Sequence, residues 1–236
     1  MNATMQVAAE DVRAFRRDGW VVLRHVVTPA DVARLGALLD GHRHRHGGDV
    51  VDEPSAAGGG KDGYGDPNSD VSRDYFLSVP GVAEWHHEVG LYDAARALLG
   101  VDEVRVVRDR LFVKEPGVGE RTMWHQDAPF THEATGELVV LWIPLAIDGA
   151  AGAPLRIACG THTGPAILES GLSWWLEVIG PEFEVVEEAD IEDRYRVETA
   201  LASVGDIVVL HGQVVHSSEP NRSASERVAY SVRLSA

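Results

Sequence analysis

The second half of the sequence consists mainly of short runs of β-branched and aromatic residues, separated by turn-forming residues. Such runs have the composition of strands. Most of the predicted helices precede them, and this order indicates an antiparallel sandwich or barrel with helices on one side. The runs are VRVVRDRLFVKE (104–115), LVVLWIPLAID (138–148), GDIVVLHGQVVHSS (205–218) and RVAYSVRLSA (227–236).

The first hundred residues contain the helix signals. An amphipathic stretch that ends at Gly19 predicts a short helix, and the apolar residues 20–27 predict a strand after it. Thr28 is a candidate N-cap with Pro29 at the first helical position, so a second helix should begin there. Residues 81–99 predict one further helix that stops before a glycine.

Chain length favours a single domain that spans residues 1–236. A domain of this size buries a sizeable core without disulfides or structural metals, so a bound metal would serve chemistry. Residues 47–70 are rich in Gly, Pro, Ser and Asp and predict a long mobile loop. Residues near 164–195 form a lid-like insert, in which Trp174 and Trp175 either cover substrate or, more commonly for such residues, pack in a core.

The stretch RTMWHQDAPF (121–130) carries the first chemical signal. On a strand, residues two apart point to the same face, so His125 and Asp127 should converge while Gln126 faces away. Two ligands hold a metal weakly, so a third ligand should come from another strand.

The run GDIVVLHGQVVHSS offers two candidates for the third ligand, His211 and His216. His216 is better placed, at the end of an apolar strand just before the turn EPNRS, whereas His211 reads as structural. Two histidines and one carboxylate form a facial set that leaves three coordination positions open. This set is typical of non-haem iron(II) sites that activate oxygen.

The same segment predicts an anion site. If the chain makes a hairpin at residues 221–222, antiparallel pairing places His216 opposite Arg227. Ser218 and Ser225 then lie on the same face by the period of two. A buried arginine needs an anion, and a dicarboxylate cosubstrate would suit its bidentate guanidinium.

These residues resemble those of the phytanoyl-CoA dioxygenase family of iron(II)/2-oxoglutarate-dependent oxygenases. The similarity rests on WHQD, on GDIVVLHGQVVHSSEPN and on an arginine eleven residues after the histidine. It extends to other segments, although CGTH (159–162) departs from the family's Pro-Gly-Ser-His at Cys159 and Thr161. These segments are GWVVLRHVV, LFVKEPG, LWIPLAID and GAPLRIACGTH.

The resemblance implies a fold that is mainly β with flanking helices, a double-stranded β-helix (jelly roll, cupin-like) with iron inside its mouth. It implies a dioxygenase that uses O2 and decarboxylates 2-oxoglutarate to succinate and CO2 while it oxidises a substrate, usually by hydroxylation. Related halogenases lack the metal carboxylate, so Asp127 argues against halogenation. Desaturation, cyclisation and epimerisation stay open at the same site.

The resemblance also implies roles for individual residues. The iron ligands would be His125, Asp127 and His216, and Arg227 would hold the distal carboxylate of 2-oxoglutarate. Weaker candidates for the cosubstrate site are Ser218, Lys114 and Trp142.

Composition limits the partners and the compartment. A formal net charge of −16 disfavours nucleic acid and anionic membranes, and no apolar run is long enough to span a bilayer. A single cysteine, Cys159, and the absence of a secretory signal favour the cytoplasm. We expect a small-molecule substrate of natural-product biosynthesis and a monomer or homodimer.

Three alternative interpretations concern the site and the function. The tract HRHRH (42–46) is more simply the basic end of a helix than a metal site. A metal-dependent isomerase or lyase on the same barrel would use Arg227 for its substrate, and a metal-free binding module would use neither metal nor cosubstrate. Succinate formation distinguishes the oxygenase from both.

Overall fold

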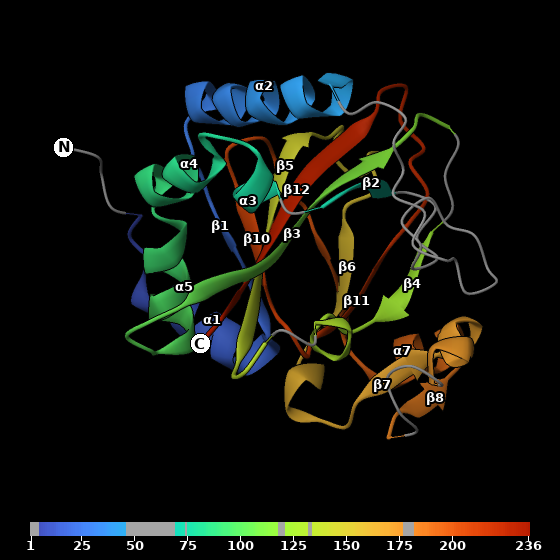
Figure 1. Cartoon of the computed structure of the whole chain (residues 1–236). Helices are drawn as coiled ribbons and strands as arrows, with labels where there is room; N and C mark the ends of the chain where they lie inside the picture. Colours follow the sequence, from blue (N-terminus) through green and yellow to red (C-terminus); the bar gives the residue numbers. More distant parts are fainter. Residues whose placement is uncertain (1–4, 46–68, 74, 118–120, 132–133, 177–181) are drawn as a thin grey trace.

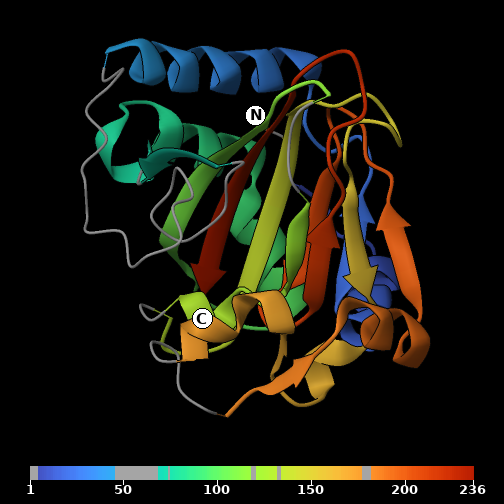
Figure 2. The same ribbon diagram turned by 90° about the vertical axis from the view of Figure 1, so that its right-hand side faces the viewer.

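The computed structural model describes residues 5–45, 69–73, 75–117, 121–131, 134–176 and 182–236. Two antiparallel sheets face each other and enclose an apolar interior (Figures 1 and 2). This arrangement confirms the predicted jelly roll with flanking helices.

The larger sheet has six strands in the order β1-β10-β5-β12-β3-β2. Its strands, in that order, are Trp20–Leu23, Ile207–His211, Leu138–Ala146, Arg227–Ser235, Arg105–Lys114 and Ser69–Arg73. The smaller sheet has the order β4-β11-β6-β9, with strands Thr122–His125, Val215–Ser218, Leu155–Ala158 and Val197–Ala200. A parallel pair, β7 (Ile167–Glu169) and β8 (Glu184–Val186), lies below β4 in Figure 1.

Helices cover the outer face of the larger sheet (Figure 1). Their apolar side chains and the outward residues of β3, β5, β10 and β12 form one buried cluster. The helices are α1 (Ala9–Asp18), α2 (Pro29–Arg45), α3 (Tyr75–Ser78), α4 (Val82–Val89) and α5 (Leu91–Leu99). A further helix, α7 (Glu188–Arg194), and the short 3-10 turns η1 (Ala128–Phe130), η2 (Thr161–Thr163) and η3 (Ser170–Trp175) follow the metal motif in sequence.

The predicted start of α2 is confirmed, because the Thr28 hydroxyl accepts a hydrogen bond from the Asp31 amide at 3.1 Å. The predicted single helix over residues 81–99 is wrong. Gly90 ends α4 and begins α5 with a φ of 79°. A Cβ on Gly90 would lie 2.8 Å from the Met5 amide nitrogen, so the close approach of the N-terminal segment requires glycine there.

The predicted hairpin between β11 and β12 is also wrong. β11 pairs with β4 and β6 in the smaller sheet, whereas β12 pairs with β3 and β5 in the larger one. In a jelly roll the chain crosses between sheets at this point, so Arg227 lies opposite Lys114 rather than His216. Ser225 precedes β12 and is exposed.

A buried polar network links the helical layer to the larger sheet. The Tyr230 hydroxyl donates to Asp109 Oδ2 at 2.5 Å and lies 2.9 Å from His86 Nε2. Because the Tyr230 hydroxyl donates its proton to Asp109, its oxygen can only accept from His86. His86 must therefore carry its proton on Nε2, which fixes its neutral tautomer. Burial, with a smaller effect of the nearby His87, lowers the pKa of His86 from 6.5 to about 3.

This network predicts loss of stability in acid. Unfolded His86 takes up a proton below pH 6.5, whereas folded His86 stays neutral until about pH 3, so stability falls as the pH drops through that window. The contribution of one such group approaches about 1.4 kcal/mol per pH unit. Unfolding by denaturant between pH 4.5 and 7 should show a shallower pH dependence in His86→Gln than in the wild type.

The exposed neighbour His87 provides the matched control. His87→Gln should keep most of the wild-type pH dependence. Equal slopes in the wild type and His86→Gln would show that His86 is not held neutral in the folded state.

Candidate metal centre

The structure brings three predicted ligands together. His125, the last residue of β4, lies directly across from His216 of β11, with ring centroids 4.3 Å apart. Asp127 Oδ1 is 3.9 Å from His125 Nε2, and Asp127 Oδ2 is 3.7 Å from His216 Nε2. One potential ligand atom from each residue lies within 4.8 Å of the other two, as a metal ion would require.

Asp127 reaches this position by a turn, and the prediction that it lies on a strand is wrong. β4 ends at His125, and Asp127 has helical dihedral angles as the residue that precedes η1. Gln126 does face away, as predicted. Its amide donates to the Gln213 carbonyl at 2.6 Å and accepts from the Ile167 amide at 2.9 Å, which fixes the turn against two other segments.

Both imidazoles are oriented by backbone carbonyls. His125 Nδ1 lies 2.8 Å from the Met123 carbonyl and His216 Nδ1 lies 3.1 Å from the Val214 carbonyl. A carbonyl only accepts, so each Nδ1 carries the proton and each Nε2 keeps a lone pair for a metal. Burial, and then the neighbouring His125, lower the pKa of His216 to about 4, so its ring is neutral near pH 7.

The Asp127 carboxylate has a partner that the sequence analysis missed. Arg233 of β12 forms an ion pair with it through Nη2 and Oδ1. Burial would raise the pKa of Asp127, but the positive charge of Arg233 holds it well below its usual range. Arg233 lies on the same face of its strand as Arg227 by the period of two, and this pattern could have indicated it.

Strand β4 is held against β7 by an ion pair and a hydrogen bond. Arg121 forms a bidentate ion pair with Glu169 of β7, with 2.8 Å between Nη1 and Oε2. The same Oε2 accepts a hydrogen bond from the Trp124 amide at 2.8 Å. These contacts join the metal motif to the segment that was predicted to be an insert.

The four predicted cosubstrate residues also lie close together. The Arg227 guanidinium lies 5.6 Å from the ring centroid of Trp142, and Arg227 is the register partner of Lys114. Lys114 Nζ donates to Ser218 Oγ at 2.8 Å and to the carbonyls of Ser218 and Glu219 at 3.3 and 2.9 Å. All four side chains are buried. The Lys114 ammonium group therefore has three acceptors within the protein.

Other predicted candidates lie apart from this centre. His211 packs against His162 and accepts from the Gln213 amide at 3.1 Å, so it is not one of the three clustered ligands. The side chains of His42–His46, Trp174 and Trp175 lie outside the described residues, as does most of the predicted loop 47–70.

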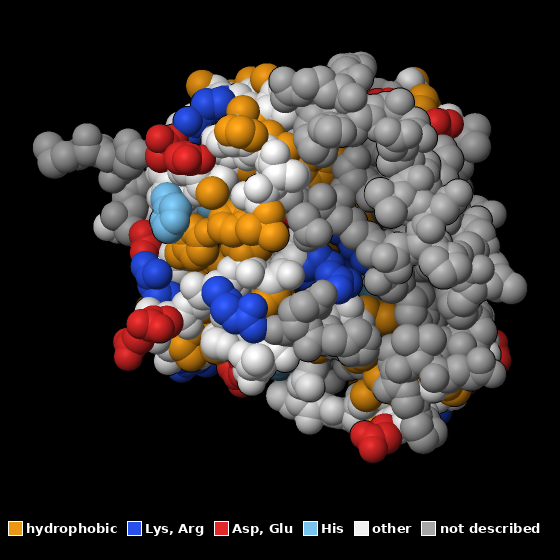
Figure 3. Space-filling model, viewed as in Figure 1, with side chains coloured by type: hydrophobic (Ala, Val, Ile, Leu, Met, Phe, Trp, Pro, Cys, Tyr) orange, Lys and Arg blue, Asp and Glu red, His pale blue; other side chains and the backbone are white. Residues whose placement is uncertain are grey.

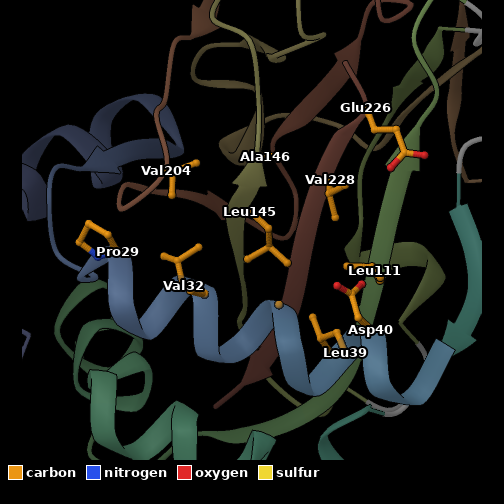
Figure 4. Close-up of a pocket in the computed structure, with 12 residues that line it drawn as sticks. Pro29, Val32, Leu39, Asp40, Leu111, Leu145, Ala146, Val204, Glu226 and Val228 are labelled. Atoms are coloured by element: carbon orange, nitrogen blue, oxygen red, sulfur yellow. The ribbon is translucent and has the colours of Figure 1, made fainter. Parts of the chain in front are cut away.

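A cavity of about 360 Å³ lies elsewhere, between α2 and the outer face of the larger sheet (Figure 4). Apolar residues such as Val32, Leu39 and Val228 line it, with Asp40 and Glu226 at its edge. It is on the opposite face of that sheet from Arg227 and is not part of the metal centre.

The surface shows local positive charge despite the formal net charge of −16. Lys and Arg side chains lie in the middle of the face viewed in Figure 1, next to hydrophobic side chains (Figure 3). No helix within the described residues is long and apolar enough to cross a membrane.

Comparison with known proteins supports one family. The family model for phytanoyl-CoA dioxygenase (PhyH) matches residues 15–229, which is most of the chain. The bovine phytanoyl-CoA dioxygenase domain-containing protein 1 is 31% identical over 137 residues, a match that covers 58% of this chain and 46% of that protein. The chain thus spans less than half of that relative.

Two other proteins match over nearly the whole chain. L-proline trans-4-hydroxylase of Streptomyces griseoviridis is 25% identical over 228 residues, which covers 90% of this chain and 81% of the enzyme. The crystal structure of SnoK, a non-haem α-ketoglutarate-dependent carbocyclase of nogalamycin biosynthesis, superposes with a TM-score of 0.73 at 19% identity. That superposition covers 99% of this chain and 86% of SnoK and shows a shared fold.

The geometry predicts which histidine of the segment 205–218 matters for metal binding. His216→Ala should abolish stoichiometric Mn(II) binding, because it removes a ligand from the cluster. His211→Ala, five residues earlier on the same segment, should bind Mn(II) as the wild type does. Anaerobic titration followed by electron paramagnetic resonance measures both, and equal loss in the two variants would contradict the assignment.

Proposed function

The chain belongs to the phytanoyl-CoA dioxygenase family of iron(II)/2-oxoglutarate-dependent oxygenases, and on this basis we propose that it hydroxylates a small organic molecule. One observation supports this proposal above all. Two imidazoles and one carboxylate cluster in the barrel, and a buried arginine, Arg227, lies on β12 of the larger sheet.

The donor set fits iron(II). His125, Asp127 and His216 would hold the ion, since two imidazole nitrogens and one carboxylate oxygen occupy one face and leave three positions open. The bound ion would supply oxygen activation coupled to decarboxylation of 2-oxoglutarate. O2 and 2-oxoglutarate are therefore the proposed cosubstrates.

Arg227 would hold the distal carboxylate of 2-oxoglutarate. Arg227 is buried, with a relative exposure of 3% for the residue, so an ionic contact there is little screened by solvent. The nearby Trp142 ring limits the rotamers of the guanidinium, and Ser218 and Lys114 shape the same end of the interior. A guanidinium held in one orientation can donate two parallel hydrogen bonds to a planar carboxylate.

Relatives support a small-molecule substrate. One is an L-proline hydroxylase, and a protein of the same fold is a carbocyclase of nogalamycin biosynthesis, so we favour hydroxylation and keep cyclisation as the second outcome. Natural-product biosynthesis in the cytoplasm is part of this proposal. Segments 47–70 and 164–195 are proposed covers of the barrel mouth within one domain, because oxidation needs exclusion of water.

The direct test is succinate formation. Anaerobically purified protein with iron(II), 2-oxoglutarate and oxygen should release succinate, slowly without substrate and faster when a substrate is added. Candidate metabolites are then screened by mass spectrometry for a gain of one oxygen atom or a loss of two hydrogens. Absence of succinate from a protein that binds Mn(II) would favour the isomerase or lyase alternative.

Arg227→Lys should raise the concentration of 2-oxoglutarate needed for half-maximal succinate formation. Lysine keeps the charge but not the two parallel hydrogen bonds, and a charge-assisted contact contributes about 1.5–3 kcal/mol, or roughly 10- to 100-fold in affinity. Arg222→Lys, at an exposed position of the preceding turn, is the control and should match the wild type. An unchanged requirement in Arg227→Lys would move the carboxylate site elsewhere.

A further inference from the structure

Arg233 faces the barrel interior, where a buried charge is costly unless partners compensate it. It shares one face of β12 with Arg227 and with Ala229, which belongs to the interior apolar cluster. Its side chain is buried, with a relative exposure of 6% for the residue. Together with Asp127, it forms an ion pair that joins the larger sheet to the metal motif.

The ion pair divides the two oxygens of Asp127. Arg233 Nη2 contacts Oδ1, whereas Oδ2 is the oxygen nearer to His216 Nε2. A carboxylate held in this way presents one oxygen to a metal, because chelation through both would compete with the arginine. Single-oxygen binding keeps a coordination position open, and partners of this kind orient a ligating carboxylate.

The other terminal nitrogen of Arg233 has no such partner. Nη1 is buried and has no hydrogen-bond partner within the described part of the chain. The guanidinium is planar, so Nη1 lies beside Nη2 and is fixed next to the metal ligands once Nη2 holds Asp127. A buried donor without an acceptor is costly, and a carboxylate is the acceptor that matches both its charge and its geometry.

An anion bound at Nη1 would differ from the one that Arg227 is proposed to hold. The two arginines are six residues apart on one strand, roughly 20 Å between Cα atoms at the usual rise per residue. Arg233 therefore does not share the distal carboxylate of 2-oxoglutarate. A carboxylate bound by Arg233 would come either from the end of the cosubstrate near the metal or from the substrate itself.

We propose that Arg233 holds Asp127 in single-oxygen geometry through Nη2 and binds a carboxylate of the cosubstrate or substrate through Nη1. This inference rests on the proposed function. It makes Arg233 a positioning residue for the metal and a determinant of carboxylate recognition.

The first experiment measures the metal. Arg233→Gln removes the positive charge. Arg233→Lys keeps a charge that balances Asp127 and serves as the second variant if Arg233→Gln does not fold. Both should weaken Mn(II) binding by about 10- to 100-fold and change the Mn(II) resonance spectrum. Arg156→Lys is the control, because Arg156 forms ion pairs with Glu192 and Glu219, and neither glutamate belongs to the cluster of potential metal ligands.

The second experiment locates the carboxylate with Mn(II)-loaded protein at metal saturation. Mn(II) broadens the nuclear magnetic resonance lines of molecules bound near it, which allows titration of simple probes. 2-Oxobutyrate carries only the carboxylate next to its keto group and represents the end of the cosubstrate near the metal. Benzoate, compared with benzamide in protein saturated with 2-oxoglutarate, represents a substrate carboxylate.

Arg233→Lys should weaken one of these probes by about tenfold or more relative to the wild type and to Arg156→Lys. Weaker binding of 2-oxobutyrate identifies the cosubstrate as the source of the carboxylate. Weaker binding of benzoate with unchanged binding of benzamide identifies the substrate as the source. Wild-type affinity for Mn(II), or for both probes, in the Arg233 variants would overturn the inference while succinate formation still supports the proposed function. A wild-type protein that binds neither Mn(II) nor 2-oxoglutarate overturns both.

Discussion

A carboxylate buried inside an apolar barrel is the constraint on which the rest of this structure depends. Removing such a charge from water costs several kcal/mol unless partners compensate it. Here Arg233 of the larger sheet pairs with Asp127, which follows a strand of the smaller sheet. The ion pair therefore closes the sandwich at the same point where it prepares the metal site. Fold and site are stabilised by one interaction, and neither can be altered there without the other.

The two faces of β12 show how register links stability to chemistry. Arg227 and Arg233 point into the barrel, whereas Tyr230 points to the helical layer, where it joins Asp109 and His86. A slip of one residue would bury the arginines among the apolar residues of the helical layer and expose the tyrosine network to the interior. Polar groups on both faces thus specify one register, which apolar packing alone would specify less strongly.

The fold class and the clustering of His125, Asp127 and His216 could be predicted from the sequence, because both depend largely on local signals. Strand composition, the Thr28 cap and the residue types around His125 and His216 are readable without tertiary information. The hairpin, the single helix over 81–99 and the strand position of Asp127 failed for one shared reason. Each depends on a distant contact: the crossing between sheets, the approach of Met5 to Gly90, and the anchoring of Gln126 by Gln213 and Ile167. Arg233 was missed because its partner is 106 residues away in sequence.

The ligands of the metal centre are oriented by the protein itself. Backbone carbonyls fix both imidazole tautomers, Gln126 fixes the turn and Glu169 fixes β4, so each ligand has a partner that does not depend on an ion. The conformational entropy of ordering these side chains is then lost during folding rather than on metal binding. In a structural zinc site the opposite holds, since the metal supplies the free energy of folding. The same preorganisation keeps Asp127 ionised by Arg233 and both Nε2 lone pairs directed at one point. A metal ion that enters this site meets side chains that the protein has already oriented, and the open coordination positions are left to the small molecules that react there.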